Sequence, residues 1–529
     1  MNLESDPLRS TVETGNAPSA FASLLYRFSA TSPLLLGLIQ CLTSAAIVLI
    51  MLGTPVLEGR AGMMNLTESW GALERVALWQ RSLSWIPGVE QNGGIYQLPV
   101  AAIAWLIRLL LLTLFLVHAI ALIAAWSGPL RSKMQWLTGP VGSLILMIGF
   151  VPSNADIFFY EISGDIANSG TNPYTHYLYE FGNNPILPYN HWVDMTTVYG
   201  PFWTGINRLI MGSTGPDPYI ATVIYKVMFG LAAIGLALLT AWITQRLTGS
   251  RRLATVALVF VAWHPTIILE SSGQAHNDIV VALISTVGMA AVLLGGIAGL
   301  RAAIIIVTLS STVKYVTLPL VGILGLLRLT DRNRPDPVRR ILGSWLLDGT
   351  AILAVIVATF APYWAGPETF REMFLEPGRL FAHPIWLVPY LLMSQFAAGG
   401  VVSFYVEFVR IGLQIATFVL LLYLIVRYIR SLWTPNIPDA EEPSDSRPWW
   451  TGHLIRAWVG VLAILALVPA NSHAWYWTWT VAPIAVLLCW NRSQDSSPET
   501  SIELPRWLIP YLVLIATMTL IYHTRIVMN

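Results

Sequence analysis

One short stretch of the chain combines a carboxylate with an aromatic hydroxyl at helical spacing. Asp156 and Tyr160 are four residues apart, so a helix places both on one face. Such a carboxylate can take a proton from an attacking hydroxyl, which is general base chemistry. It can also merely stabilise the positive end of the helix dipole, and spacing alone favours this second interpretation. Asp165 falls on nearly the opposite face, so the two carboxylates are not expected to share a site.

A second group of polar residues precedes a long apolar run. His276, Asn277 and Asp278 stand at the start of the run 277–297, where an ionisable residue is either functional or part of a solvated turn. Further along, Lys314 interrupts apolar sequence, and a cation held there needs an anionic partner. A lipid phosphate and the carboxylate of Asp278 both satisfy that need, so the sequence leaves the partner open.

A third group is aromatic. His473, Trp475 and Tyr476 follow one another closely between two late apolar runs. Their rings can stack on a sugar or contact a phosphate, but they are equally typical of the aromatic belt at a membrane surface.

Composition predicts the elements that position these residues. Hydrophobic residues make up 55% of the 529 positions and charged residues 11%, whereas soluble proteins carry about 25% charged residues. Apolar runs of roughly 20 residues, long enough to cross a membrane, predict an all-α polytopic transmembrane helical protein of about 12–14 spans. The predicted spans are 34–54, 97–126, 136–152, 217–246, 253–270, 277–297, a broken pair within 302–328, 341–362, 402–431, 453–470, 474–490 and 506–525.

Basic residues predict the orientation of these spans, because arginine and lysine gather in short cytoplasmic loops. With the N-terminal tail 1–33 in the cytoplasm, the basic clusters all fall on that side, and the segment 153–216 lies on the outer side of the cell membrane.

The segment 301–328 is basic at both ends, so it must enter and return as a broken hairpin that turns at 312–314. Such backbone is tolerated only where protein buries it or a wet cavity adjoins it, so we expect a cavity. The net charge of +1 gives no reason to expect nucleic acid as a partner.

The segment that carries Asp156 is itself expected to be helical. Ser153 or Asn154 can cap a helix that continues to about Asn168. Its apolar residues cluster on one face, so we expect this helix to lie along the membrane surface with that face down, among the surface-lying helices of a large outer loop. These apolar residues are Phe158, Phe159, Ile162 and Ile166.

Four separated blocks of sequence resemble a known family. The blocks are Asp156-Ile-Phe-Phe-Tyr160 with Gly170-Thr-Asn172-Pro173-Tyr174 and Tyr199-Gly200-Pro201; Trp263-His264-Pro265 with Gly273-Gln-Ala-His276-Asn277-Asp278; Val313-Lys314; and Asn471-Ser-His473-Ala-Trp475-Tyr476. Over residues 136–490 their order is similar to that in GT-C superfamily glycosyltransferases. The similarity is greatest to the polyprenol-phosphate-mannose-dependent mannosyltransferases of bacterial cell envelopes. His264 departs from that pattern, which has asparagine there.

The resemblance implies a GT-C-like transmembrane catalytic region at 136–529, preceded by two N-terminal transmembrane helices with an outer loop at 34–135. It implies an inverting glycosyltransferase on the outer face of the cell membrane, among membrane lipids. That enzyme moves a sugar, mannose, from a polyprenyl-phosphate donor to a lipoglycan, glycolipid or polysaccharide acceptor. Neither a cofactor nor a metal is implied.

The resemblance also implies roles for individual residues. Asp156 is the expected general base, and His276 and Lys314 are expected to bind the donor phosphate. The expected substrate-binding residues are Tyr160, Asn172, Tyr174, Tyr199, Asn277, Asp278, His473, Trp475 and Tyr476. The alternative function is a transporter or flippase for a lipid-linked saccharide, since buried charges and broken helices also occur in transporters. Polar chemistry gathered in an outer loop favours the enzyme, whereas a midplane site between repeats favours transport.

Overall fold

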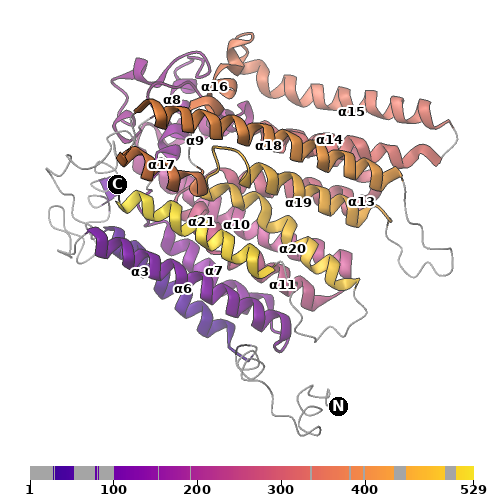
Figure 1. Cartoon of the computed structure of the whole chain (residues 1–529), viewed down its shortest axis with the longest axis horizontal. Helices are drawn as coiled ribbons and strands as arrows, with labels where there is room; N and C mark the ends of the chain where they lie inside the picture. The colour runs from indigo at the N-terminus through magenta and orange to yellow at the C-terminus, as the bar shows by residue number, and fades with distance from the viewer. Residues whose placement is uncertain are drawn as a thin grey trace, which may run out of the picture.

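The chain folds into a bundle of helices that run largely side by side (Figure 1). This computed structural model describes residues 28, 30–52, 78–79, 82, 100–152, 154–190, 192–333, 336–379, 383–396, 399–433, 448–494 and 508–528. Most of the tail 1–33, most of the predicted loop 55–96, and Ser153 lie outside these residues. The helices are α3 (Pro33–Leu52), α6 (Val100–Ser127), α7 (Lys133–Met147), α8 (Asp156–Asn168), η1 (Leu178–Phe181), η2 (Leu187–Tyr189), α9 (Pro201–Thr214), α10 (Pro218–Thr248), α11 (Arg251–Ala262), α12 (Pro265–Ile268), η3 (Leu269–Gly273), α13 (Asp278–Ser311), η4 (Tyr315–Thr317), α14 (Leu318–Leu326), η5 (Leu327–Asn333), α15 (Pro337–Phe360), η6 (Ala361–Tyr363), η7 (Glu368–Phe370), α16 (Arg371–Arg379), α17 (Pro384–Phe396), α18 (Gly399–Trp433), α19 (Thr451–Leu467), η8 (Ala474–Trp477), α20 (Thr478–Ser493) and α21 (Leu508–Met528).

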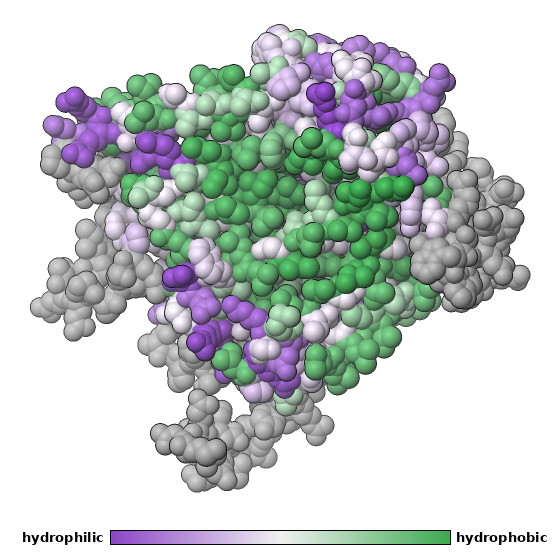
Figure 2. Space-filling model, turned by 180° about the vertical axis from the view of Figure 1, so that it is seen from behind, coloured by the Kyte–Doolittle hydropathy of each residue, from purple (hydrophilic) through white to green (hydrophobic). Residues whose placement is uncertain are grey.

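Within the described residues, 6 helices are long and apolar enough to cross a membrane, or 7 if a pair bent by 51° counts as one span. The six are Pro33–Met51, Trp105–Ser127, Pro218–Thr248, Asp278–Ser311, Pro337–Tyr363 and Gly399–Trp433, and the bent pair is Arg251–Ala262 with Pro265–Gly273. Asp278–Ser311 counts here as one helix by length and composition, although its backbone is non-helical at Gly296. Hydrophobic residues form a broad belt between regions where hydrophilic residues gather (Figure 2). The all-α polytopic class is therefore confirmed. The sequence predicted more spans, about 12–14, because shorter apolar runs were counted as well; such runs include the helices Thr451–Leu467 and Leu508–Leu520.

The predicted broken hairpin begins inside α13. Gly296 has φ 58° and ψ −147°, so α13 reverses there and its second arm runs back along the first. Ser310 Oγ donates to the Val281 carbonyl at 3.3 Å, which joins the two arms near their far ends. A Cβ on Gly299 would lie only 2.0 Å from the Ala291 carbonyl oxygen, so glycine permits this close approach. Asp278, at the start of the first arm of α13, and the 312–314 turn, after its second arm, therefore lie at the same end of this pair of arms.

A buried carboxylate fastens the other end of the segment 301–328. Asp348 of α15 accepts hydrogen bonds from Nε of Arg301 at 3.0 Å and from Nε of Arg328 at 2.9 Å. Both ends of the segment thus lie together, as the predicted hairpin requires. The carboxylate of Asp348 is 4% exposed, and the two arginines supply the partners that an intramembrane charge requires.

A buried lysine holds the segment that precedes α8. Lys226 of α10 is 0% exposed, and its Nζ donates to the carbonyls of Ile148 at 3.2 Å and of Phe150. The last carbonyls of a helix lack intrahelical partners and carry partial negative charge, so the ammonium group caps α7. Lys226 stands alone in an apolar run, and nothing in its spacing predicted this contact.

Helix α8 is enclosed by protein. It packs against α9 and α10, and 10 of its 13 residues are buried. The expected apolar face is present, but the face that was expected to be polar is covered as well. Glu161 and Ser163 are both 0% exposed. The sequence predicted a helix lying along the membrane surface on its apolar face, whereas α9 folds back over α8 and protein covers the other face as well. Gly164 permits that contact, since a Cβ there would lie 2.5 Å from the Asn207 carbonyl oxygen.

Asp348→Asn should lower the midpoint of thermal unfolding in detergent, because it leaves Arg301 and Arg328 without their carboxylate. Removing one partner of a buried ion pair costs about 3–5 kcal/mol. The share from Arg301, which is 44% exposed, is reduced by solvent screening. Glu368→Gln is the control, because Glu368 is 49% exposed in its pair with Arg371, outside the candidate spans, and such a surface pair contributes only ~0–1 kcal/mol. Equal shifts for both variants would contradict the prediction.

Candidate active site

The N-terminus of α8 carries the candidate base. Asn154 Oδ1 accepts a hydrogen bond from the backbone N–H of Asp156 at 3.2 Å, which satisfies an amide that a helix start leaves unpaired. The Asp156 side chain is 13% exposed, and its Oδ2 accepts a hydrogen bond from the Tyr199 hydroxyl at 3.1 Å. Tyr160 packs edge-to-face on Tyr199, with ring centroids 4.9 Å apart. The predicted shared face of Asp156 and Tyr160 is therefore confirmed.

Asp165 belongs to a different environment, as its position in the helix predicts. Its Oδ2 accepts a hydrogen bond from Asn184 Nδ2 at 2.6 Å, so it ties α8 to the loop that follows η1.

A break in a membrane-spanning segment positions the candidate histidine. The span formed by α11, α12 and η3 bends after Ala262, and η3 is a single π-helical turn. Ala275, just beyond it, has φ 61°, in the left-handed region that residues other than glycine rarely adopt. The backbone N–H of His276 then donates to the Glu270 carbonyl at 2.8 Å. Such strained backbone persists only where its surroundings hold it, and it is concentrated at functional sites.

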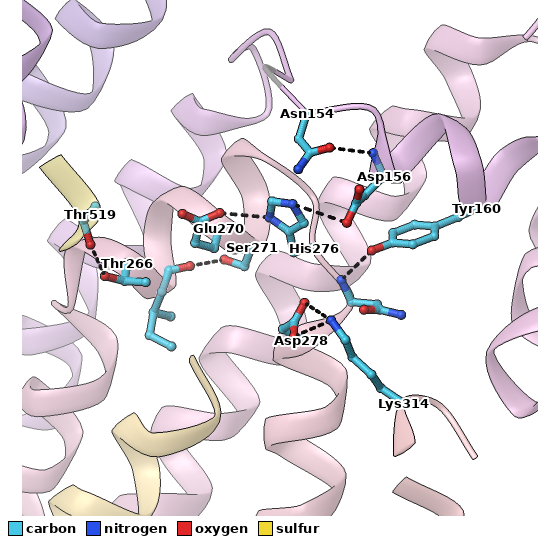
Figure 3. Close-up of polar contacts among 12 residues, drawn as sticks. Asn154, Asp156, Tyr160, Thr266, Glu270, Ser271, His276, Asp278, Lys314 and Thr519 are labelled. Atoms are coloured by element: carbon cyan, nitrogen blue, oxygen red, sulfur yellow. Dashed lines mark hydrogen bonds and ion pairs between the residues drawn. The ribbon is translucent and has the colours of Figure 1, made fainter. Parts of the chain in front are cut away.

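The His276 side chain lies between two carboxylates (Figure 3). Its Nδ1 is 2.9 Å from Oε2 of Glu270, and its Nε2 is 3.9 Å from Oδ2 of Asp156. The face of the ring stacks on Trp475, with centroids 3.9 Å apart. His473 stacks on the same indole at 4.3 Å, so the late aromatic group joins the histidine of the second group.

Lys314 and Asp278 form the ion pair that the sequence allowed. Lys314 Nζ lies 3.0 Å from Oδ1 and 3.2 Å from Oδ2 of Asp278 (Figure 3). Asp278 is 1% exposed, whereas the lysine side chain is 18% exposed. The ammonium group also lies over aromatic rings, 4.6 Å from the centroid of Tyr476 and 5.9 Å from that of Tyr199. These rings add cation–π attraction and shield the pair from water.

Two of the resembling blocks meet through their backbones. The N–H of Gly200 donates to the Val313 carbonyl and the N–H of Phe202 donates to the Thr312 carbonyl, both at 3.0 Å. A Cβ on Gly200 would lie 2.1 Å from the Thr312 carbonyl oxygen, so this contact requires glycine. The contact places Tyr199 beside Lys314.

Asn172 and Tyr174 bind other parts of the protein. Asn172 Oδ1 accepts from the Tyr174 N–H at 3.0 Å, and its Nδ2 donates to the Tyr363 carbonyl at 2.8 Å. The Tyr174 hydroxyl donates to the Tyr199 carbonyl at 2.8 Å. Tyr174 therefore positions the loop that holds Tyr199, Asn172 joins its own segment to Tyr363, and neither side chain joins the cluster around Asp156.

The backbone and the side chain of Asn277, the remaining predicted residue, differ in their hydrogen bonding. Its backbone N–H donates to the Tyr160 hydroxyl at 3.3 Å. Its side-chain amide is buried and has no hydrogen-bond partner among the described residues, so it can bind an atom that enters the site.

Burial raises the pKa of the Tyr160 and Tyr199 hydroxyls, and the Asp156 carboxylate beside them raises it further. Both phenols therefore stay protonated at neutral pH, and Tyr199 remains a hydrogen-bond donor to Asp156. That bond orients the carboxylate, while part of Asp156 stays exposed to an incoming hydroxyl.

Sequence reasoning missed Glu270. Its signal was present, because Glu270 is an acidic residue inside an otherwise apolar run, which is a functional hypothesis by default. The departure at His264 also has a structural counterpart. The His264 ring lies 5.1 Å from that of His118 in α6, so this substitution packs against an N-terminal helix.

Comparisons with known proteins support the resemblance noted in the sequence. The family model described as "Alpha-(1->6)-mannopyranosyltransferase, N-terminal domain" matches residues 30–330, which is more than half of the chain and includes α3 and α6. A curated relative is the "Alpha-(1->6)-mannopyranosyltransferase A" of Corynebacterium glutamicum. It is 27% identical over 222 residues, which are 40% of this chain and 44% of the relative, so the match spans less than half the relative's length. No solved structure matches the chain. The chain belongs to the alpha-(1->6)-mannopyranosyltransferase family.

Proposed function

We propose that this protein transfers a mannosyl residue from a polyprenyl-phosphate donor to a lipoglycan or polysaccharide acceptor. Family membership supports the sugar, and the names of the family and of the relative suggest an α-(1→6) linkage. The observation that carries the proposal is the contact of one tyrosine with two opposite charges. Tyr199 donates to the carboxylate of Asp156, and its ring lies 5.9 Å from the ammonium group of Lys314. A candidate base and a cation therefore both lie next to the Tyr199 side chain.

In this mechanism Asp156 accepts the proton of the acceptor hydroxyl, and the oxygen attacks the anomeric carbon with inversion. The bond from that carbon to the phosphate oxygen breaks, and the electron pair leaves with the lipid phosphate. Lys314 stabilises the charge that develops on this leaving group. Because Asp278 already holds Lys314, the phosphate shares the ammonium group with that carboxylate. The remaining N–H of Lys314 is directed to neither oxygen of Asp278, since an ammonium group has three donors.

The position of the cluster supports an enzyme over a transporter. Asp156 and Asp278 are each the first residue of a helix, so the candidate groups gather at one end of their helices. A transporter of the inverted-repeat type places its site near the membrane midplane. We place this end on the outer face of the cell membrane, with the N-terminus in the cytoplasm, because the arginine-rich turns lie at the opposite ends of the spans.

An assay of the purified protein with several polyprenyl-phosphate sugars tests the proposed reaction. The mannosyl donor should be used in preference to the others. Asp156→Asn should lower turnover by about 10²–10⁴-fold, because it keeps the shape of the side chain but removes its basicity. Donor binding, measured by titration, should persist.

Asp165→Asn is the matched control, because Asp165 lies on the same helix but contacts Asn184. Its effect on turnover should be much smaller. Loss of transfer in Asp165→Asn with retention in Asp156→Asn would show that the wrong carboxylate was chosen. Normal transfer in both variants would exclude the mechanism.

The role of Lys314 is tested with two variants. Lys314→Met leaves Asp278 buried without a partner, so it should both destabilise the protein and weaken donor binding. The double variant Lys314→Met/Asp278→Leu removes both charges and should recover thermal stability while donor binding stays weak. Recovery of full activity in the double variant would assign Lys314 a structural role only.

The orientation is tested by cysteine labelling in a background without Cys41 and Cys489. Asn183→Cys, in the exposed loop after η1, should react with a membrane-impermeant maleimide in intact cells. Met134→Cys is the control, since Met134 is 71% exposed beside Lys133 at the opposite end. It should react only after permeabilisation. The reverse pattern would overturn the proposed topology.

A further inference from the structure

Glu270 is a buried acid that the mechanism above does not use. It lies in η3, is 1% exposed, and contacts His276 through both its backbone and its side chain. Its carbonyl accepts the backbone N–H of His276 at 2.8 Å, and its Oε2 lies 2.9 Å from the ring Nδ1. With Glu270 ionised, a ring nitrogen at that distance must carry a proton, so Nδ1 donates to Oε2 of Glu270.

The other ring nitrogen consequently faces the candidate base. Nε2 lies 3.9 Å from Oδ2 of Asp156 and has no hydrogen-bond partner among the described residues. Stacking on Trp475, at 19° between the planes, prevents the ring from turning out of this position. The imidazole is thus held at one edge, along one face and in one orientation.

We propose that Glu270 is a positioning residue that keeps Nδ1 of His276 protonated, so that Nε2 takes up the proton removed from the acceptor. This inference rests on the proposed transferase function. The acceptor O–H gives its proton to Asp156, whose side chain then moves to bring Oδ2 within hydrogen-bond distance of the fixed ring and passes the proton to Nε2. The oxygen bonds to the sugar carbon, and the phosphate leaves with the bond electrons. One proton ends on His276, and Asp156 returns to its carboxylate form.

The surrounding charges suit a proton stored on this ring. A phosphodiester donor carries one negative charge and the departing monoester acquires a second, so an imidazolium beside it offsets the change. The carboxylates that act on His276 are Asp156, Glu270 and Asp278, and His473 stacks on the same indole as the His276 ring.

A pair of substitutions at Glu270 tests the proposal. Glu270→Gln keeps an oxygen that can accept from Nδ1–H, whereas Glu270→Leu removes every acceptor. We expect kcat to fall in that order, by about 10²–10⁴-fold for the leucine variant, with little change in the KM for the donor. Nitrogen-15 spectra of histidine-labelled protein in liposomes, assigned with His276→Gln, should show a protonated Nδ1 in the parent and the glutamine variant. The leucine variant should show a protonated Nε2.

Glu161→Gln is the matched control, because Glu161 is equally buried in α8 but pairs with Thr222. Burial raises the pKa of the Glu161 carboxyl, which favours the neutral acid that glutamine resembles. Its kcat and His276 spectrum should match those of the parent. An unchanged His276 spectrum or an unchanged kcat in Glu270→Leu would overturn the proposal, and so would an equal loss in Glu161→Gln. If the parent protein transfers no mannose, the transferase function fails instead, while the spectra still report what Glu270 does.

Discussion

The pairing of Lys314 with Asp278 is the interaction on which the rest of the site depends. Two opposite charges at the end of an apolar hairpin are tolerated only together, because either alone would have to be stripped of water without compensation. The reversal of α13 at Gly296 brings them to the same end. The turn before Lys314 then offers its backbone carbonyls to the loop at Gly200, which carries Tyr199 to Asp156.

The unpaired backbone groups at helix ends explain why the candidate site lies where helices begin and end. A helix leaves unpaired N–H groups at its start and unpaired carbonyls at its end, and inside a membrane protein these need partners. Asn154 meets this need for α8, and Lys226 meets it for the carbonyls at the end of α7. The same ends supply irregular positions where polar side chains can gather, and Asp156 at one of them stays partly exposed. Asp156 and Asp278 each occupy the first position of a helix.

The segment from α12 to α13 combines strain with close packing. A π-helical turn and the positive φ of Ala275 redirect the chain within a few residues, at a cost that only the surroundings can offset. Here the surroundings are the Glu270–His276 contacts and the stacked Trp475. Asp156, the Glu270–His276 pair and Trp475 therefore come together from three parts of the chain that are more than 100 residues apart in sequence.

Hydropathy alone determined the all-α membrane class, because only helices satisfy backbone groups over long apolar runs. The basic residues at both ends of 301–328 likewise predicted the broken hairpin, and helical periodicity separated Asp156 from Asp165. Tertiary structure decided what periodicity cannot express. Both faces of α8 are buried because α9 folds back over it. Of the two partners that the sequence left open for Lys314, Asp278 is the one that lies beside it. Tertiary structure also turned Asn172 and Tyr174 toward other parts of the chain and brought Glu270 to His276. These outcomes depend on distances between segments remote in sequence, and residue type and spacing carry no information about such distances.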